Sequence, residues 1–200
     1  MKKIILASSS NDRKELFDRI GIVFEVIPSE IDENQLKSKI SDPIKLVKEL
    51  AKAKVLHVKD LLLKKNSQAI IIAADTVVEL DGNIIGKADN PDEAFEIIKS
   101  LCAESHNLIT GFAITEVGKQ KIIVDYDITS VDFLNLSDEE IENYIRTNEW
   151  KGRAGAYSIN DKASLFISKI NGSSSNVIGI PMHRIYEILK TEFDINLFQI

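Results

Sequence analysis

The sequence predicts a mixed α/β fold, in which helices flank a mixed sheet. Three observations support it: an apolar strand pattern over residues 69–80, amphipathic helical patterns between strand segments, and hairpin signals at 81–82 and 118–119. Strands and helices do not alternate strictly, so a regular strand-helix repeat is not expected. With 200 residues, 44% of them hydrophobic, residues 1–200 can form a single domain, or two lobes that share one sheet.

The first half of the chain is expected to open with a strand, a loop and a helix. Ser10 is a suitable N-cap for this helix, because a serine hydroxyl accepts a backbone N–H at that position, and Gly21 ends it. Asp42 before Pro43 marks the start of a second, longer helix. The expected elements are a strand over 3–7, the helix between 10 and 21, a strand over 23–27 and a helix over about 43–64.

The second half of the chain carries stronger turn and cap signals. Asp81-Gly82 is typical of a two-residue hairpin turn, Asn90-Pro91 of a helix start, and Ser137 to Glu140 of a capping box. The expected elements are a strand over 70–80 that turns back over 83–86, a helix from 90, two strands within 106–133, a helix over about 137–147, a strand over 164–170, a polar loop over 172–176 and a helix over about 181–193.

The composition limits the partners that the protein is expected to have. The net charge is −6, which argues against a long nucleic acid, because binding its phosphates requires a basic stripe. The longest apolar stretch, residues 69–74, is far shorter than the roughly 20 residues of a membrane span. The N-terminus lacks the apolar region of a secretory signal. We therefore expect a cytoplasmic protein that does not enter a membrane.

Asp75 is the most informative residue. It interrupts the apolar strand pattern of residues 69–78, where a carboxylate is costly to bury unless another group compensates its charge. Competition between burial and a nearby cation or metal is common at catalytic carboxylates. A strand-end carboxylate that caps a turn is the alternative that the residues alone leave open.

Other charged residues suit a phosphate ligand. Arg13 stands in a first helical turn, where a cation opposes the helix dipole, and an arginine fork beside serines at a helix start suits phosphate. Lys87 follows the hairpin, and the turn could return it to Asp75. Lys54 lies among other lysines and by itself indicates a solvated surface charge. Glu33 is one of three nearby acids, which suit either a divalent cation or an exposed loop.

The order and spacing of several short motifs resemble the Maf-type nucleoside triphosphate pyrophosphatases, over nearly the whole chain. No single motif is decisive, but their combination is highly specific. The motifs are Leu6-Ala7-Ser8-Ser9-Ser10 with Arg13, Ile31-Asp32-Glu33, residues 51–54, Ala74-Asp75-Thr76-Val77-Val78, Gly86-Lys87, residues 106–111, Ala154-Gly155-Ala156-Tyr157, Gly172-Ser173 and residues 175–181.

The resemblance implies an elongated mixed sheet with two lobes around a central nucleotide cleft, similar to the inosine triphosphate pyrophosphatases. It also implies a divalent cation, magnesium or manganese, with Glu33 and Asp75 as its candidate ligands, and a homodimer. Asp75 takes the role of the proton acceptor. By position, the residues assigned to the phosphates are Lys54, Lys87 and Arg13, with Ser8 and Ser10 in the phosphate loop.

The implied reaction is hydrolysis of a nucleoside triphosphate to the monophosphate and pyrophosphate. Water attacks the α-phosphate, Asp75 takes its proton, and the metal and the lysines neutralise the charge that develops on pyrophosphate. Two alternatives stay open: a relative specialised for methylated guanosine triphosphate, and a nucleotide-binding regulator of cell division. The presence of Asp75 together with Lys54 and Lys87 favours catalysis.

Three departures from the family pattern concern substrate choice. In relatives that act on thymidine and uridine triphosphates, an arginine, a threonine and a glutamine are linked to that choice; Thr76 is retained, but Asp12 and Asn160 replace the other two. Ser174 replaces a tyrosine that is frequent in the family. A carboxylate only accepts hydrogen bonds, so Asp12 facing the base would favour donor-rich edges such as guanine or cytosine. The alternative is an exposed acid at a helix N-terminus.

Overall fold

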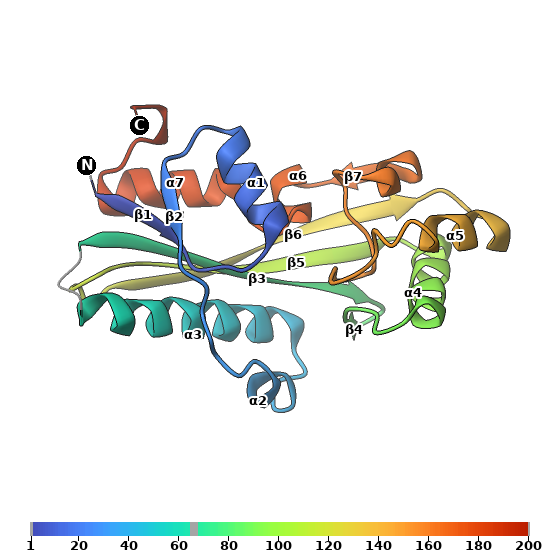
Figure 1. Ribbon diagram of the computed structural model, residues 1–200, viewed down its shortest axis with the longest axis horizontal. Helices are drawn as coiled ribbons and strands as arrows, with labels where there is room; N and C mark the ends of the chain where they lie inside the picture. The colour runs from blue at the N-terminus through green and yellow to red at the C-terminus, as the bar shows by residue number, and fades with distance from the viewer. Residues whose placement is uncertain (1, 65–67, 200) are drawn as a thin grey trace. The chain divides into compact units, whose positions relative to one another are not determined.

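The computed structural model describes residues 2–64 and 68–199. Within these residues, seven strands form one sheet in the order β2-β1-β3-β5-β6-β7, with β4 paired to β3 (Figure 1). The strands are β1 (Lys3–Leu6), β2 (Phe24–Val26), β3 (Ala69–Leu80), β4 (Asn83–Ile85), β5 (His106–Glu116), β6 (Ile122–Phe133) and β7 (Ile167–Asn171). The α-helices are α1 (Asn11–Arg19), α2 (Asn34–Lys37), α3 (Pro43–Leu63), α4 (Pro91–Ala103), α5 (Asp138–Ile145), α6 (Ser174–Val177) and α7 (Met182–Phe193).

The sheet is mixed, as the sequence predicts. Strand β1 pairs in parallel with both β2 and β3, whereas β4 runs antiparallel to β3 and β7 antiparallel to β6. The predicted hairpin turn is confirmed: Asp81 and Gly82 both adopt the left-handed conformation, with φ of 50° and 80°, as a two-residue turn of this kind requires. The mixed α/β prediction is therefore confirmed, while a single domain with a cleft between two lobes stays a prediction.

Most helix starts lie where the cap signals place them. The side chains of Ser10, Asp42 and Asn90 accept a backbone N–H of the first turn of α1, α3 and α4, respectively. Ser137 and Glu140 form the complete capping box of α5. These local side-chain to backbone bonds satisfy N–H groups that the helix itself leaves without a partner.

The predictions near the C-terminus need two corrections. Residues 164 and 165 belong to a 3-10 helix, Lys162–Leu165, because the Ser164 amide donates to the Asp161 carbonyl and closes a turn; β7 therefore starts only at Ile167. The predicted polar loop over 172–176 contains the start of α6, since the Ser173 side chain caps a short helix. The short helix α2 was not predicted from the sequence.

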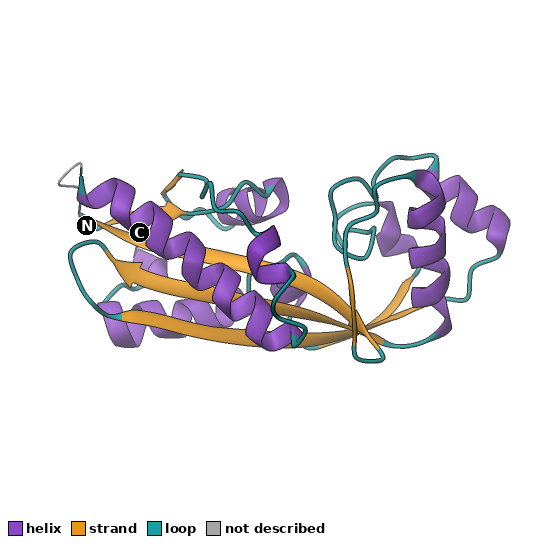
Figure 2. Cartoon of the chain, turned by 90° about the horizontal axis from the view of Figure 1, so that it is seen from below, coloured by secondary structure: helices purple, strands orange, loops and turns teal. Residues whose placement is uncertain are grey.

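The chain divides into two compact units. The first unit comprises Met1–Asp75, Thr110–Asp127 and Gly179–Ile200. In it, α3 covers one face of the sheet, and α1 and α7 cover the other (Figure 1); Figure 2 shows α3 lying lengthwise along the strands. The apolar face of α3 packs on alternate residues of β3, on β1 and on the residue that follows β1. The packed residues are Ala51, Val55, Val58 and Leu62 with Ile5, Ala7, Ile71 and Ala73.

Gly111 fixes how closely α3 approaches β5 in the first unit. A Cβ atom at this position would overlap the carbonyl group of Val47 and the amide nitrogen of Lys48, both backbone groups of α3. Backbone cannot move aside as the end of a flexible side chain can, so only glycine fits without displacing the helix.

The second unit comprises Thr76–Ile109 and Ile128–Ile178 and has its own aromatic core. His106 is fully buried there, and its Nε2 lies 2.9 Å from the Tyr157 hydroxyl. The His106 ring also makes edge-to-face contacts with Tyr157 and Phe133. Tyr144 donates a 3.0 Å hydrogen bond to the carbonyl of Ala156, a residue with a φ of 60°. The core thus holds a strained loop in place through buried hydroxyl groups.

Among residues 2–64 and 68–199, no helix is both long and apolar enough to cross a membrane.

We predict that His106 makes the stability of the protein depend on pH between 6.5 and 4. Burial lowers the pKa of His106 from 6.5 to about 4. Between these pH values His106 is protonated in the unfolded chain but neutral in the folded chain. The free energy of unfolding therefore falls as the pH falls, and the loss approaches about 3 kcal/mol below pH 4. His106→Gln should lack this contribution. Urea unfolding of both proteins at pH 4, 5, 6 and 7 measures it, and identical pH dependence would contradict the prediction.

Candidate active site

Asp75 lies on β3 in the first unit, and its side chain is buried. The parallel pairing of β1 with residues 69–72 fixes the strand just before this position. The Nζ atom of Lys54 donates a 2.5 Å hydrogen bond to Oδ1 of Asp75. Among the residues described, Lys54 is the hydrogen-bond partner of Asp75. The second carboxylate oxygen of Asp75, Oδ2, receives no hydrogen bond from these residues.

Lys54 is brought to Asp75 by the helix that carries it. It lies on α3 three residues after Ala51 and four before Val58, both of which are fully buried against the sheet. Residues with this spacing share one face of a helix, so the packing of α3 also buries Lys54. Its exposed fraction is 8%, the same as that of Asp75. The interpretation of Lys54 as a solvated surface charge is therefore wrong.

Glu33 joins this ion pair from the start of α2. Its Oε1 lies 2.8 Å from Nζ of Lys54, and its Oε2 accepts a 2.7 Å hydrogen bond from Lys37. Burial of Glu33 opposes its charge, but the hydrogen bonds and charges of Lys37 and Lys54 outweigh this effect and lower its pKa to about 2. Glu33 is thus ionised at neutral pH. Because Glu33 is half-buried and paired with two lysines, the alternative interpretation of an exposed acidic loop does not fit this residue.

Arg13 and the serine loop form the other side of the site. Arg13 is 9% exposed, and burial lowers its pKa, while the charges of Asp75, Glu33 and Asp12 raise it. Its Nε donates to the Gly179 carbonyl at 2.7 Å. One terminal nitrogen, Nη1, donates to the Ala74 carbonyl at 2.9 Å and to Ser8 Oγ at 3.2 Å. These bonds were not foreseen from the sequence, because they depend on backbone carbonyls.

Ser8 and Ser10 differ in what their side chains bind. Ser8 is buried, and its Oγ accepts from the Ser10 amide at 3.2 Å in addition to Arg13. Ser10 is the N-cap of α1, and its Oγ accepts from the Arg13 amide at 3.4 Å. The structure therefore brings together five of the predicted site residues in the first unit: Asp75, Lys54, Glu33, Arg13 and Ser8, with Ser10 beside Ser8.

Four further residues were predicted for the site: Lys87, Asp12, Thr76 and Asn160. Lys87, in the second unit, is exposed and forms an isolated bridge with Ala154, while the Gly155 amide donates to the Gly86 carbonyl at 3.1 Å. Asp12 is half-buried in the first turn of α1, Thr76 is half-buried on β3, and Asn160 is exposed in the second unit. That Lys87 lies beside Asp75 stays a prediction.

The carboxylates of Asp75 and Glu33 suit a hard divalent cation. Both lie within hydrogen-bond distance of the same Lys54 nitrogen, so their oxygens are close to each other. Magnesium is commonly held by one or two carboxylates and completed by water and substrate phosphates. The described residues hold no cluster of three or more histidine, cysteine or acidic side chains placed for a metal. These two carboxylates therefore fit a cation that arrives with a phosphate ligand.

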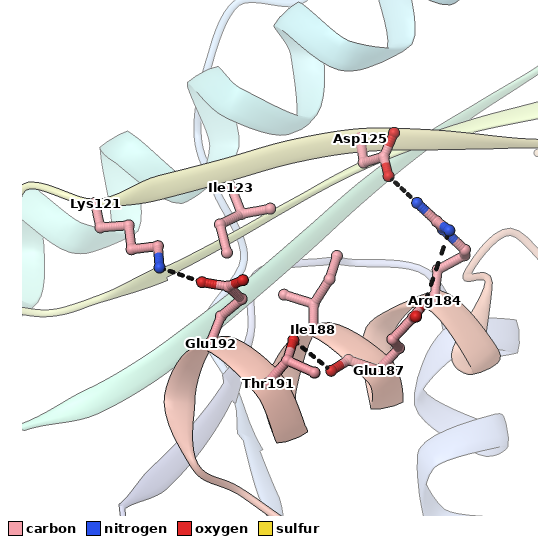
Figure 3. Close-up of a pocket in the computed structure, with 8 residues that line it drawn as sticks. All are labelled: Lys121, Ile123, Asp125, Arg184, Glu187, Ile188, Thr191 and Glu192. Atoms are coloured by element: carbon pink, nitrogen blue, oxygen red, sulfur yellow. Dashed lines mark hydrogen bonds and ion pairs between the residues drawn. The ribbon is translucent and has the colours of Figure 1, made fainter.

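A separate hollow of about 450 Å³ lies between β6 and α7 in the first unit (Figure 3). Its apolar floor is formed by Ile123 and Ile188, and its rim by ion pairs of Lys121 with Glu192 and of Arg184 with Asp125. None of the predicted site residues lines it. Since its charged groups already compensate one another, it offers no comparable chemistry.

The sequence of this chain is similar to a protein-family model and to several known proteins. A family model described as Maf-like protein matches residues 3–192. A protein named dTTP/UTP pyrophosphatase from Alkaliphilus oremlandii is 45% identical over 197 residues, which cover 98% of this chain and 100% of the relative. Proteins of the same name from Clostridium tetani and Caldicellulosiruptor bescii are 41% and 40% identical, cover 96% of this chain, and are themselves covered to 98% and 100%.

A solved structure, that of a nucleoside-triphosphatase / dITP/XTP pyrophosphatase from Mycobacterium abscessus, shares 12% identity with the chain at a TM-score of 0.39. The match covers 67% of this chain and 74% of that one. A likeness at this level carries no argument about fold or function.

Lys54→Met should destabilise the protein by about 3–5 kcal/mol, because it leaves two buried or half-buried carboxylates without their shared cation. Urea unfolding at pH 7 measures the loss. Lys52→Met on the same helix is the matched control; the Lys52 side chain is 44% exposed, so a change below about 0.5 kcal/mol is expected. Equal losses in the two variants would show that the Lys54 ion pairs contribute nothing specific.

Proposed function

The chain belongs to the Maf-like protein family, and on this premise we propose that it hydrolyses a nucleoside triphosphate to the monophosphate and pyrophosphate. The observation that supports this most strongly is the buried Asp75–Lys54 ion pair, which the half-buried Glu33 joins. Burial of Asp75 and Lys54, with Glu33 half-buried beside them, is costly, and functional sites are where such costs are commonly found. The names of the relatives, dTTP/UTP pyrophosphatase, agree with the reaction.

Asp75 acts as the general base in this proposal. Lys54 holds Oδ1, so Oδ2 is the oxygen that takes the proton from water. The oxygen of that water forms a bond to the α-phosphorus as the bond to the bridging oxygen of pyrophosphate breaks. The products are the nucleoside monophosphate and pyrophosphate, and the proton passes from Asp75 to solvent. A positioned base of this kind contributes roughly 10²- to 10⁴-fold to rate.

Glu33 and Asp75 would hold a divalent cation, magnesium or manganese, together with phosphate oxygens. When bound, the cation would supply positive charge that offsets the charge of the triphosphate and of the leaving pyrophosphate. Glu33 is suited to this role because its pKa of about 2 keeps it ionised at neutral pH.

The lysines supply fixed positive charge. Lys54 is already committed to two carboxylates, so its main role is to hold Asp75 and Glu33 at a defined separation. The family resemblance assigns Lys87 to the phosphates, and its exposed position leaves its ammonium group accessible to a ligand. A lysine ammonium is a compact point charge and suits phosphate oxygens.

Thymidine and uridine triphosphates are the favoured substrates in this proposal, because the relatives described above are named for them. Thr76 agrees with this choice, but Asp12 and Asn160 depart from the family pattern linked to it. A base-facing Asp12 would instead favour guanine or cytosine, which present hydrogen-bond donors to a carboxylate.

Asp75→Asn should reduce kcat by at least about 100-fold, since an amide cannot accept the proton from water at this position. The shape of the side chain is kept, so the variant should remain folded. Release of pyrophosphate from dTTP with magnesium, together with a circular dichroism spectrum, measures both properties. Asp60→Asn, an exposed acid on α3, is the control, and turnover of Asp75→Asn close to wild type would remove Asp75 as the base.

A panel of triphosphates tests the base preference. We expect kcat/KM for dTTP and UTP to exceed that for GTP and CTP by at least tenfold, with little change in Asp12→Ala. A preference for GTP or CTP that is lost in Asp12→Ala would instead assign Asp12 to the base. The panel should include methylated guanosine triphosphate, because a preference for it supports the alternative substrate class.

A further inference from the structure

The guanidinium group of Arg13 is directed at protein atoms. Its Nε donates to the Gly179 carbonyl, and its Nη1 donates to both the Ala74 carbonyl and Ser8 Oγ. Three of the five N–H groups of an arginine are accounted for by these bonds. With 9% of its surface exposed, Arg13 joins three segments that are far apart in the sequence.

The hydroxyl group of Ser8 uses both of its acceptor positions and keeps its donor. A serine oxygen can accept two hydrogen bonds and donate one. Both acceptor positions of Ser8 are used, by Arg13 and by the Ser10 amide. Ser8 is 7% exposed, and within the part of the chain that the structure describes, no acceptor for its proton is found. The proton is therefore available to an acceptor outside the protein, such as a phosphate oxygen.

We propose that Arg13 is a positioning residue and not a phosphate ligand: by binding the Ala74 and Gly179 carbonyls and Ser8 Oγ, it holds Asp75 in place and directs the Ser8 proton to the substrate. This inference rests on the proposed function and departs from the role that the family resemblance implies for Arg13.

The bond to Ala74 explains the link to catalysis. Ala74 directly precedes Asp75 on β3, so the position of the Ala74 carbonyl constrains the backbone that carries the base. Loss of this bond would let Asp75 depart from the distance at which it takes a proton. A displacement of this kind lowers kcat much more than it weakens substrate binding.

The bond to Gly179 depends on a special backbone conformation. Gly179 has a φ of 100°, which is accessible to glycine but costly for other residues. Its carbonyl accepts the hydrogen bond from Arg13 at the start of the segment that leads to α7. The guanidinium group spreads its five donors over three nitrogen atoms in a fixed plane, whereas the three donors of a lysine all radiate from one nitrogen.

The test compares Arg13→Lys, which keeps the charge, with Arg13→Met, which keeps only the bulk. For each, kcat and KM for dTTP and the inhibition constant of pyrophosphate are measured per folded molecule, with the melting temperature recorded separately. We expect kcat to fall at least tenfold in both variants, with lysine no better than methionine. KM should stay within about threefold of wild type, and the pyrophosphate inhibition constant should rise by no more than about fivefold, because only the orientation of the Ser8 proton is lost.

The opposite pattern would overturn the inference. If Arg13 binds phosphate, Arg13→Met should raise KM and the pyrophosphate inhibition constant at least tenfold, and Arg13→Lys should restore much of this loss. A lower melting temperature with unchanged kcat would also overturn it, because Arg13 would then be merely structural. Arg19→Lys and Arg19→Met, at an exposed position in the last turn of the same helix, are the matched controls.

Ser8→Ala keeps the inference testable if the Arg13 variants do not fold. Removing the Ser8 hydroxyl should raise the pyrophosphate inhibition constant at least fivefold, whereas Ser9→Ala, at the exposed neighbouring position, should not change it. An unchanged constant in Ser8→Ala would overturn the assignment of the Ser8 proton. Failure of wild-type protein to release pyrophosphate from any triphosphate would instead remove the proposed function itself, so the two failures are distinguishable.

Discussion

The ion pair between Lys54 and Asp75 is the interaction on which the site depends. Transfer of two charges from water to a buried position costs several kcal/mol for each, and their attraction offsets this only with good geometry and further hydrogen bonds. The 2.5 Å contact and the second carboxylate, Glu33, provide both. A pair of apolar residues would fill the same space without this cost, so the charges are better explained by chemistry than by stability.

The packing of the first unit makes this pair possible. Lys54 can be buried only because Ala51, Val55 and Val58 seat the same face of α3 on the sheet, and because Gly111 lets the helix approach β5 closely. Asp75 in turn lies on the same strand, beyond Ile72, where the parallel pairing of β1 with β3 ends. The apolar contacts thus set the distance between α3 and β3, and this distance allows Lys54 to reach Asp75.

Elements with local signals could be predicted from the sequence, and contacts between distant segments could not. The caps at Ser10, Asp42 and Asn90 and the Asp81-Gly82 turn are set by neighbouring residues, and each is confirmed. Asp75 stood out because a carboxylate conflicts with an apolar strand. Lys54 gave no such signal among its neighbouring lysines. The strand expected over 164–170 starts late, at Ile167, because the Ser164 amide closes a turn of the 3-10 helix Lys162–Leu165.

Two of the buried cations of the first unit, Lys54 and Arg13, bind acceptors that are arranged differently. Lys54 meets two carboxylates that converge on one point, which a compact ammonium satisfies with its three donors. Arg13 meets carbonyl and hydroxyl oxygens from three separate segments, which require donors spread over a rigid plane. The family resemblance assigns both side chains to the phosphates of a triphosphate. Because each is already bound to the protein, the site is organised before a ligand arrives, and little of the binding energy is lost in ordering these groups.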